Sequence, residues 1–238
     1  MDQRYLDELY KMLWSKPHPN AHEKNLFKKT QKYIQYIAWI PGIEMIAVCN
    51  SVAFYATHKD SDIDLFVITQ EKRLWIVRSF MTVIFFILGV WRKGSDIREH
   101  FCLSFFITTK ALDLKNIAIP DDIYLMGWIH TLKPIINHNH TYERFLEANN
   151  DWVKLTGAEK IANMQYIQTH KDVRWWTSII LDILEQYLQY FLFPRTLKRY
   201  KQLGKPWWVI LSEHMLKFHD QDKRIQIRDT ILEKNFDK

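Results

Sequence analysis

Apolar residues near the start of the chain recur every three or four positions, which is the period of an amphipathic helix. The pattern predicts helices at 3–15 and 21–39, separated by the helix-breaking segment 16–20 (KPHPN). Pro41-Gly42 then ends the second helix. The chain is therefore expected to begin with two helices that each bury one face.

From residue 43 the pattern changes to that of a sheet. Runs rich in β-branched and aromatic residues predict strands at 43–49 (IEMIAVC), 62–69 (DIDLFVIT) and 98–108 (REHFCLSFFIT). A short helical turn at 50–56 follows the first strand, and a long apolar helix at 71–91 connects the second strand to the third. This alternation favours an α/β unit with a small mixed sheet.

Beyond Pro120 the period becomes helical and remains so. Helices are expected at 121–132, 141–155, 157–168, 172–193, 196–203, 206–218 and 221–235. The predicted fold class is α+β, with a small mixed β-sheet core, N-terminal helices and an all-helical C-terminal region. We place an α/β domain at 1–130 and a helical domain at 131–238, with the boundary between residues 115 and 140.

Candidate chemistry lies between the first two predicted strands. Asn50-Ser51 forms a small polar pair at the strand-to-helix turn, and the second strand opens with Asp62-Ile63-Asp64. Residues i and i+2 of a strand share a face, so both carboxylates converge on one spot. Two such carboxylates suit Mg²⁺ or Mn²⁺, which prefer oxygen ligands. Ser51, at a helix N-terminus, is placed to attract phosphate.

This segment resembles the signature of the DNA polymerase β-type nucleotidyltransferase superfamily, over about residues 40–110. That signature has a Gly-Ser or Gly-Gly pair at a strand-to-helix turn, a spacer of this length, and Asp-x-Asp on the next strand. The resemblance implies that Ser51 contacts a nucleoside triphosphate while Asp62 and Asp64 hold the metals. It also implies transfer of a nucleotidyl group to a hydroxyl acceptor, which is a small molecule, a protein or an RNA end.

Three further residues are candidates for binding the nucleotide phosphates. Asn50 stands where the superfamily has Gly, and Asn tolerates the left-handed backbone that such a turn requires. Lys59 and Arg78 supply positive charge, although a solvated surface also explains Lys59. Arg78 interrupts an apolar helix, so it needs a partner, either at the site or in a purely structural ion pair.

The superfamily places a third carboxylate on a later strand, which corresponds here to 98–108. The polar face of that strand carries His100, Cys102 and Ser104, and no Asp or Glu. Strict alternation puts Glu99 on the other face unless a bulge reorients it. Alternation also assigns three residues to the apolar face: Phe101, Leu103 and Phe105.

The missing carboxylate leaves three alternatives open. Glu99 substitutes for it, another group such as His100 serves, or the domain binds nucleotide without catalysing transfer. The last alternative describes a catalytically impaired nucleotide- or RNA-binding module.

Charge and cysteine content bear on the partners and the compartment. The net charge is +6, and residues 195–238 contain 11 Lys and Arg against 6 Asp and Glu. A basic C-terminal region suits RNA or another anionic molecule, although a solvated helical face explains it equally well. The two cysteines lie in apolar runs, which predicts neither a disulfide framework nor a zinc site and favours the cytoplasm.

Two apolar segments raise the question of larger assemblies. The segment 74–91 is interrupted by Arg78 and Ser79, and its unbroken part, 83–91, is shorter than the roughly 20 residues that span a bilayer. We therefore expect no stable membrane insertion. The predicted helix 172–193 carries an apolar stripe wide enough to pack against the α/β domain or a second subunit, as in a homodimer.

Overall fold

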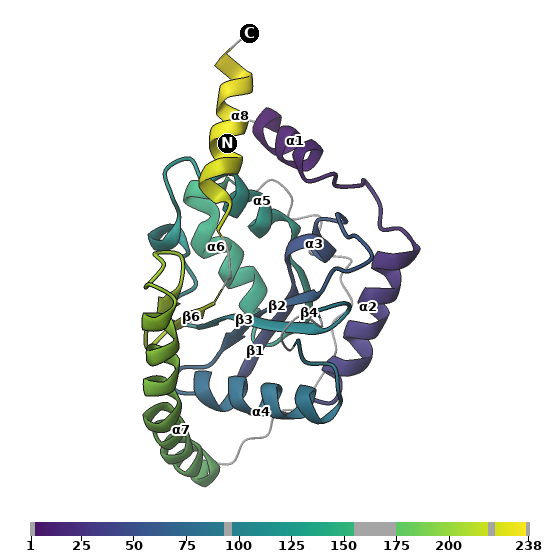
Figure 1. Ribbon diagram of the computed structural model, residues 1–238. Coiled ribbons are helices and arrows are strands. Elements are labelled where there is room, and N and C mark those ends of the chain that lie inside the picture. The colour runs from purple at the N-terminus through teal and green to yellow at the C-terminus, as the bar shows by residue number, and fades with distance from the viewer. Residues whose placement is uncertain (1–2, 93–96, 155–174, 219–221, 237–238) are drawn as a thin grey trace.

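The computed structural model describes residues 3–92, 97–154, 175–218 and 222–236. These residues form a mixed six-stranded sheet in the order β4-β1-β2-β3-β6-β5, flanked by helices on both faces (Figure 1). The strands are β1 (Ile43–Val48), β2 (Ile63–Thr69), β3 (Phe101–Thr108), β4 (Lys133–Asn137), β5 (Ile210–Leu211) and β6 (Met215–Lys217). The predicted mixed sheet is therefore confirmed, although it is larger than expected.

Strand pairing follows from the connections. β1 pairs antiparallel with β2 and β4, and β6 pairs antiparallel with β3 and β5. β2 and β3 are parallel, because α4 (Leu74–Ile87) carries the chain back across the sheet between them. Alternate residues of the central strands thus enter two separate hydrophobic cores.

One core lies under α4 and α2 (Ala21–Ile34), and α7 (Trp175–Gln202) packs beside α4 (Figure 1). Glu185 of α7 accepts hydrogen bonds from the backbone N–H groups of Trp75 and Ile76, at 2.8 and 2.7 Å. These N–H groups belong to the first turn of α4, which leaves them without helical partners. A carboxylate from α7 therefore caps α4 and joins the two helices.

The other core lies under helices from the first, middle and last parts of the chain. They are α1 (Gln3–Met12), α5 (Ile123–Thr131), α6 (Thr141–Val153) and α8 (Arg224–Phe236). Two short elements complete the list: α3 (Asn50–Ala53) and a 3₁₀ turn, η1 (Lys115–Ile117). The α1 and α8 helices lie side by side near α5, so the first and last helices pack on the same face (Figure 1).

The prediction of an all-helical C-terminal region is wrong. Residues 133–137 form β4, and the predicted helix 206–218 is replaced by β5 and β6, which extend the sheet beyond β3. The apolar spacing in such short segments fits either period, and pairing with an existing strand decides between them. Residues 131–238 therefore contribute three strands to the same sheet as residues 1–130.

Helix α7 also differs from its prediction. Within the described residues, one continuous helix, with Pro194 inside it, replaces the two expected helices 172–193 and 196–203. A proline in a helix removes one N–H hydrogen bond and can bend the helix without ending it. α7 packs against α4 but leaves other large apolar side chains exposed, among them Ile179, Ile183 and Tyr187. The predicted helix 157–168 lies outside the described residues.

Among the helices that the structure describes, none combines the length and the apolar character needed to cross a membrane. Residues 74–87 of the apolar segment 74–91 instead form α4, which buries six of its residues against the sheet and α7.

Candidate metal centre

The site begins at the turn that follows β1. The backbone N–H of Cys49 donates to the carbonyl of Asp64 at 3.1 Å, which holds the end of β1 against the start of β2. Asn50 has a left-handed backbone, with φ at 52°. Its side-chain oxygen accepts hydrogen bonds from Trp128 Nε1 at 2.9 Å and from Tyr124 Oη at 3.4 Å. Asn50 therefore accommodates the turn and anchors it to α5.

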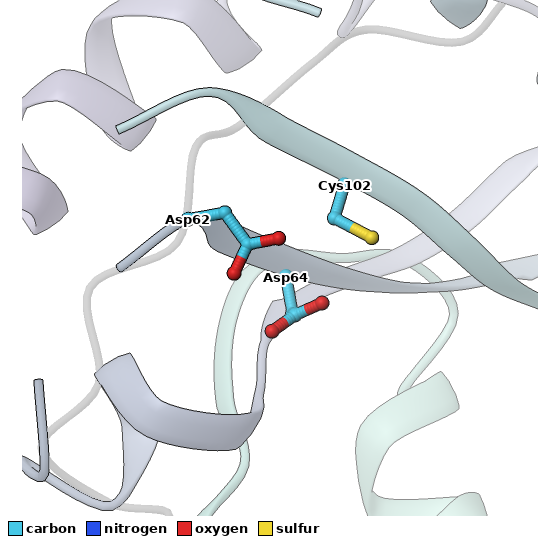
Figure 2. Close-up of side chains that lie close together, drawn as sticks. All are labelled: Asp62, Asp64 and Cys102. Atoms are coloured by element: carbon cyan, nitrogen blue, oxygen red, sulfur yellow. The ribbon is translucent and has the colours of Figure 1, made fainter. Parts of the chain in front are cut away.

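Asp62, Asp64 and Cys102 form one group of candidate metal ligands. Each offers a ligand atom within 4.8 Å of the other two. Asp62 directly precedes β2, Asp64 lies on β2, and Cys102 lies opposite Asp64 on the neighbouring parallel strand β3. Figure 2 shows the two carboxylates and the sulfur directed into one shared space. Ligands at roughly 2.0–2.6 Å from a cation lie within about 5 Å of one another, so the group fits a single ion.

The electrostatics of this group reflect crowded negative charge. Asp64 is only 9% exposed. Burial, and then the nearby Asp62, raise the pKa of Asp64 to about 6. Hydrogen bonds from Asn50 and Cys102 and the charge of Arg92 act in the opposite direction on that pKa. A bound divalent cation would offset this repulsion, which is the response expected of a metal site.

Arg92 already supplies one positive charge at the edge of the group. Its Nη1 lies 3.0 Å from Asp62 Oδ2 and 3.6 Å from Cys102 Sγ. Both side chains of the Arg92–Asp62 pair are partly exposed, at 31% and 16%. An ion pair of this kind contributes little free energy, so a cation can compete with it.

Of the four residues considered for the third position, the structure brings Cys102 to the carboxylates. Ser104 lies on the same face and hydrogen-bonds Cys102. Glu99 precedes β3, and its carboxylate instead lies 3.4 Å from Lys29. His100 also precedes the strand, where its carbonyl accepts from the N–H of Ile63 at 2.8 Å. Neither Glu99 nor His100 belongs to the group of three.

The alternation assumed along β3 fails after Ser104. The register between β2 and β3 shifts between Asp64 and Phe66, so that Phe66 faces Phe105. Phe105 therefore lines the cavity, whereas the sequence pattern assigned it to the opposite face with Phe101 and Leu103. A bulge of this kind offsets every residue that follows it by one position.

The structure does not bring Lys59 or Arg78 to the carboxylates. Lys59 is exposed, while its neighbours His58 and Asp60 line the cavity. Arg78 lies on α4, across the sheet, with its guanidinium 4.9 Å from the centre of the Phe218 ring. Burial lowers the pKa of Arg78 to about 10, and repulsion from Arg199 adds to this. Aromatic faces, rather than a phosphate or a carboxylate, surround this cation.

Beside the carboxylates lies a cavity of about 450 Å³. Asn50 and Ser51 line it, and so do α5 and the C-terminal β6–α8 segment. The sequence pattern missed the part of the lining that comes from α5, β6, α8 and the turn before α8. These residues are Tyr124, Leu125, Trp128, Lys217, Asp222, Lys223, Arg224 and Ile227. In the sequence, only the excess of Lys and Arg after residue 195 pointed to this C-terminal part of the cavity lining.

The C-terminal wall is held by a network of charges. Arg224 bonds to Asp222, with Nη2 2.8 Å from Oδ2, and to Asp122, with Nη1 2.8 Å from Oδ2. Lys217 Nζ donates to the carbonyl of Trp208 at 3.0 Å and lies 3.9 Å from Asp222. Burial lowers the pKa of Lys217 to about 8, and repulsion from Arg224 adds to this. Lys223 is exposed on the same wall.

Comparisons with protein-family models, with curated proteins and with solved structures found no match to this chain.

Proposed function

We propose that this protein is a metal-dependent nucleotidyltransferase, which moves a nucleotidyl group from a nucleoside triphosphate to a hydroxyl acceptor. The observation that carries this proposal is the meeting of Asp62, Asp64 and Cys102 at the edge of a cavity of about 450 Å³. A volume of this size lies within the range of small-molecule sites. Mg²⁺ or Mn²⁺ fits the two carboxylates, since both cations favour oxygen ligands.

The roles of the residues follow from their places in the site. Asp62 and Asp64 would hold the cation, which when bound neutralises phosphate charge. Ser51 lines the cavity beside them. α3 is a single turn, so positive charge for the phosphates must come from side chains, and Lys223 and Lys217 supply it from the opposite wall. Binding across this cavity would place the nucleotide between the strand end and the C-terminal segment.

The reaction needs little covalent chemistry from the protein. The acceptor hydroxyl oxygen bonds to the α-phosphorus, the bond from that phosphorus to the leaving oxygen breaks, and pyrophosphate departs. The hydroxyl proton leaves to the solvent. Catalysis would come from the positioning of both substrates by rigid elements. The acceptor is a small molecule, a protein side chain or an RNA end, and the cationic wall favours an anionic one.

A second candidate function has its own supporting observation. The third ligand position holds Cys102 rather than a carboxylate, and Arg92 already contacts Asp62. Both features favour a domain that binds nucleotide or RNA without turnover.

Incubation with labelled nucleoside triphosphates, a mixture of RNA and metabolites, and Mg²⁺ or Mn²⁺ separates the two functions. The transferase releases pyrophosphate, and Asp62→Ala and Asp64→Ala abolish that release. Asp151→Ala is the matched control, because this exposed carboxylate lies on α6, outside the cavity lining. Nucleotide binding without pyrophosphate release in any mixture supports the binding module and contradicts the transferase.

A further inference from the structure

The three candidate ligands differ in chemical hardness. Asp62 and Asp64 offer carboxylate oxygens, whereas Cys102 offers sulfur from the adjacent strand, and all three ligand atoms lie within 4.8 Å of one another. Hard oxygen ligands suit Mg²⁺, but Mg²⁺ has little affinity for sulfur. A site with one thiolate and two carboxylates matches zinc, which accepts Cys and Asp ligands in tetrahedral geometry.

The pairing of β2 with β3 places the cysteine sulfur beside the two carboxylates. Asp64 and Cys102 face each other across the parallel β2–β3 pair, so the backbone holds their side chains together without any ligand. Ser104, two residues further along the strand, forms a side-chain hydrogen bond with Cys102. The sulfur is therefore a fixed member of the site.

The surroundings leave a coordination position open. The two carboxylates line the cavity of about 450 Å³, while Cys102 lies behind them and is 8% exposed. Three protein ligands with a fourth position open to water or substrate is the arrangement of catalytic rather than structural zinc sites.

We propose that Cys102 makes this centre selective for thiophilic divalent metals, so that Zn²⁺ binds more tightly than Mn²⁺ and Mn²⁺ more tightly than Mg²⁺. The inference rests on the proposed function in that Asp62 and Asp64 serve as metal ligands in both. It differs in naming the third ligand and the metal class. A coordinating thiol loses its proton to a bound cation, so Cys102 binds as the thiolate.

The first test uses Co²⁺ and Cd²⁺ as spectroscopic probes of the full-length protein. Either ion bound to Cys102 produces thiolate-to-metal charge-transfer absorption in the ultraviolet, which carboxylate and histidine ligands do not give. The chain has two cysteines, and Cys49 lies outside the ligand group, which makes Cys49→Ala the matched control. We expect the absorption in wild type and Cys49→Ala and its loss in Cys102→Ser. Wild-type protein that binds Co²⁺ without this absorption overturns the proposal.

The second test measures selectivity by calorimetric titration with Zn²⁺, Mn²⁺ and Mg²⁺. Cys102→Asp replaces sulfur with oxygen, and we expect it to lower the ratio of Zn²⁺ to Mg²⁺ affinity at least about tenfold. Circular dichroism confirms that each variant is folded. An unchanged ratio in a folded Cys102→Asp protein contradicts the proposal.

Arg92→Gln sharpens the same measurement. Arg92 contacts both Asp62 and Cys102, so its positive charge competes with a bound cation. We expect the variant to bind all three metals a few-fold more tightly while their order stays the same.

The outcomes distinguish this inference from the proposed function. Mg²⁺-dependent pyrophosphate release that requires Asp62 and Asp64, without any charge-transfer absorption, removes the inference and leaves the transferase. Charge-transfer absorption without pyrophosphate release supports the inference and removes the transferase. Protein that binds none of these metals refutes both.

Discussion

The two faces of the sheet use the same strands for opposite purposes. Towards α4, β2 directs fully buried aliphatic side chains: Ile63, Leu65 and Val67. Towards α5, the alternate positions begin with Asp62 and Asp64 before they become apolar at Phe66 and Ile68. Because successive residues of a strand face opposite ways, one position along the chain separates a closed core from a polar site.

Two cations, one on each side of the sheet, have different partners. Arg78 on the α4 side lies over the rings of Trp75 and Phe218. Lys217 on the cavity side lies near Asp222 and donates to a backbone carbonyl. Arg78 thus meets aromatic surface, whereas Lys217 lies beside a carboxylate at the wall of the cavity. We infer that the α4 face mainly stabilises the fold and that the cavity face carries the function.

Phe85→Ala is expected to have the largest effect on stability. Phe85 is fully buried on the α4 face and stacks on Phe101, with ring centres 4.6 Å apart. Truncation of such a residue lowers the free energy of unfolding by about 3–5 kcal/mol. Chemical denaturation measures this loss. Metal affinity of the folded fraction should stay unchanged, and a parallel fall in affinity would show that the faces are coupled.

Asp64→Asn is expected to have the opposite effects: metal affinity falls, while stability does not. We expect Mn²⁺ affinity to fall at least about a hundredfold, because changes outside the ligand shell alone cost about 10- to 100-fold. The free energy of unfolding should not decrease, since burial already disfavours the charged carboxylate. Calorimetry and urea denaturation at neutral pH measure the two quantities, with Asp151→Asn as the control. Wild-type Mn²⁺ affinity in Asp64→Asn would count against the metal site.

Lys217→Met tests how a buried cation of the cavity face affects the pH dependence of stability. The pKa of Lys217 is lowered from 10.5 to about 8, so between these values the unfolded chain binds more protons than the native protein. Stability from this group therefore rises with pH across that window. Lys217→Met should remove a rise of about 2 kcal/mol, as measured by urea denaturation at pH 8 and 10. Lys201→Met changes an exposed position and should retain the rise in stability between pH 8 and 10.

Glu185→Gln is expected to have the smallest effect. The substitution replaces one of the two oxygens that accept from the first turn of α4, at the end of the closed face. We expect a loss of about 1 kcal/mol, seen as a lower melting temperature. Metal affinity should not change, and an altered affinity would mean that α7 influences the site through α4.

The central part of the fold was predictable because its signals are local. Both carboxylates lie at the start of a strongly apolar strand, and the helix after it has a length and composition that sheet packing requires. The short strands β4, β5 and β6 were not predicted, because their formation depends on contacts that are not local. Two to five residues carry too little pattern to specify a strand, and the partners of β4 and β6, which are β1 and β3, lie far away in the sequence.

By itself, the sequence determined that Asp62 and Asp64 share one face of a strand next to a tight turn at Asn50, because side-chain alternation and turn chemistry act within a few residues. The tertiary structure alone decided that Cys102 rather than Glu99 or His100 joins them, since this depends on the register of two parallel strands. It also decided that Lys217 and Lys223 form the opposite wall of the cavity. Contacts of that kind form when distant segments bury a common core, and no local pattern encodes them.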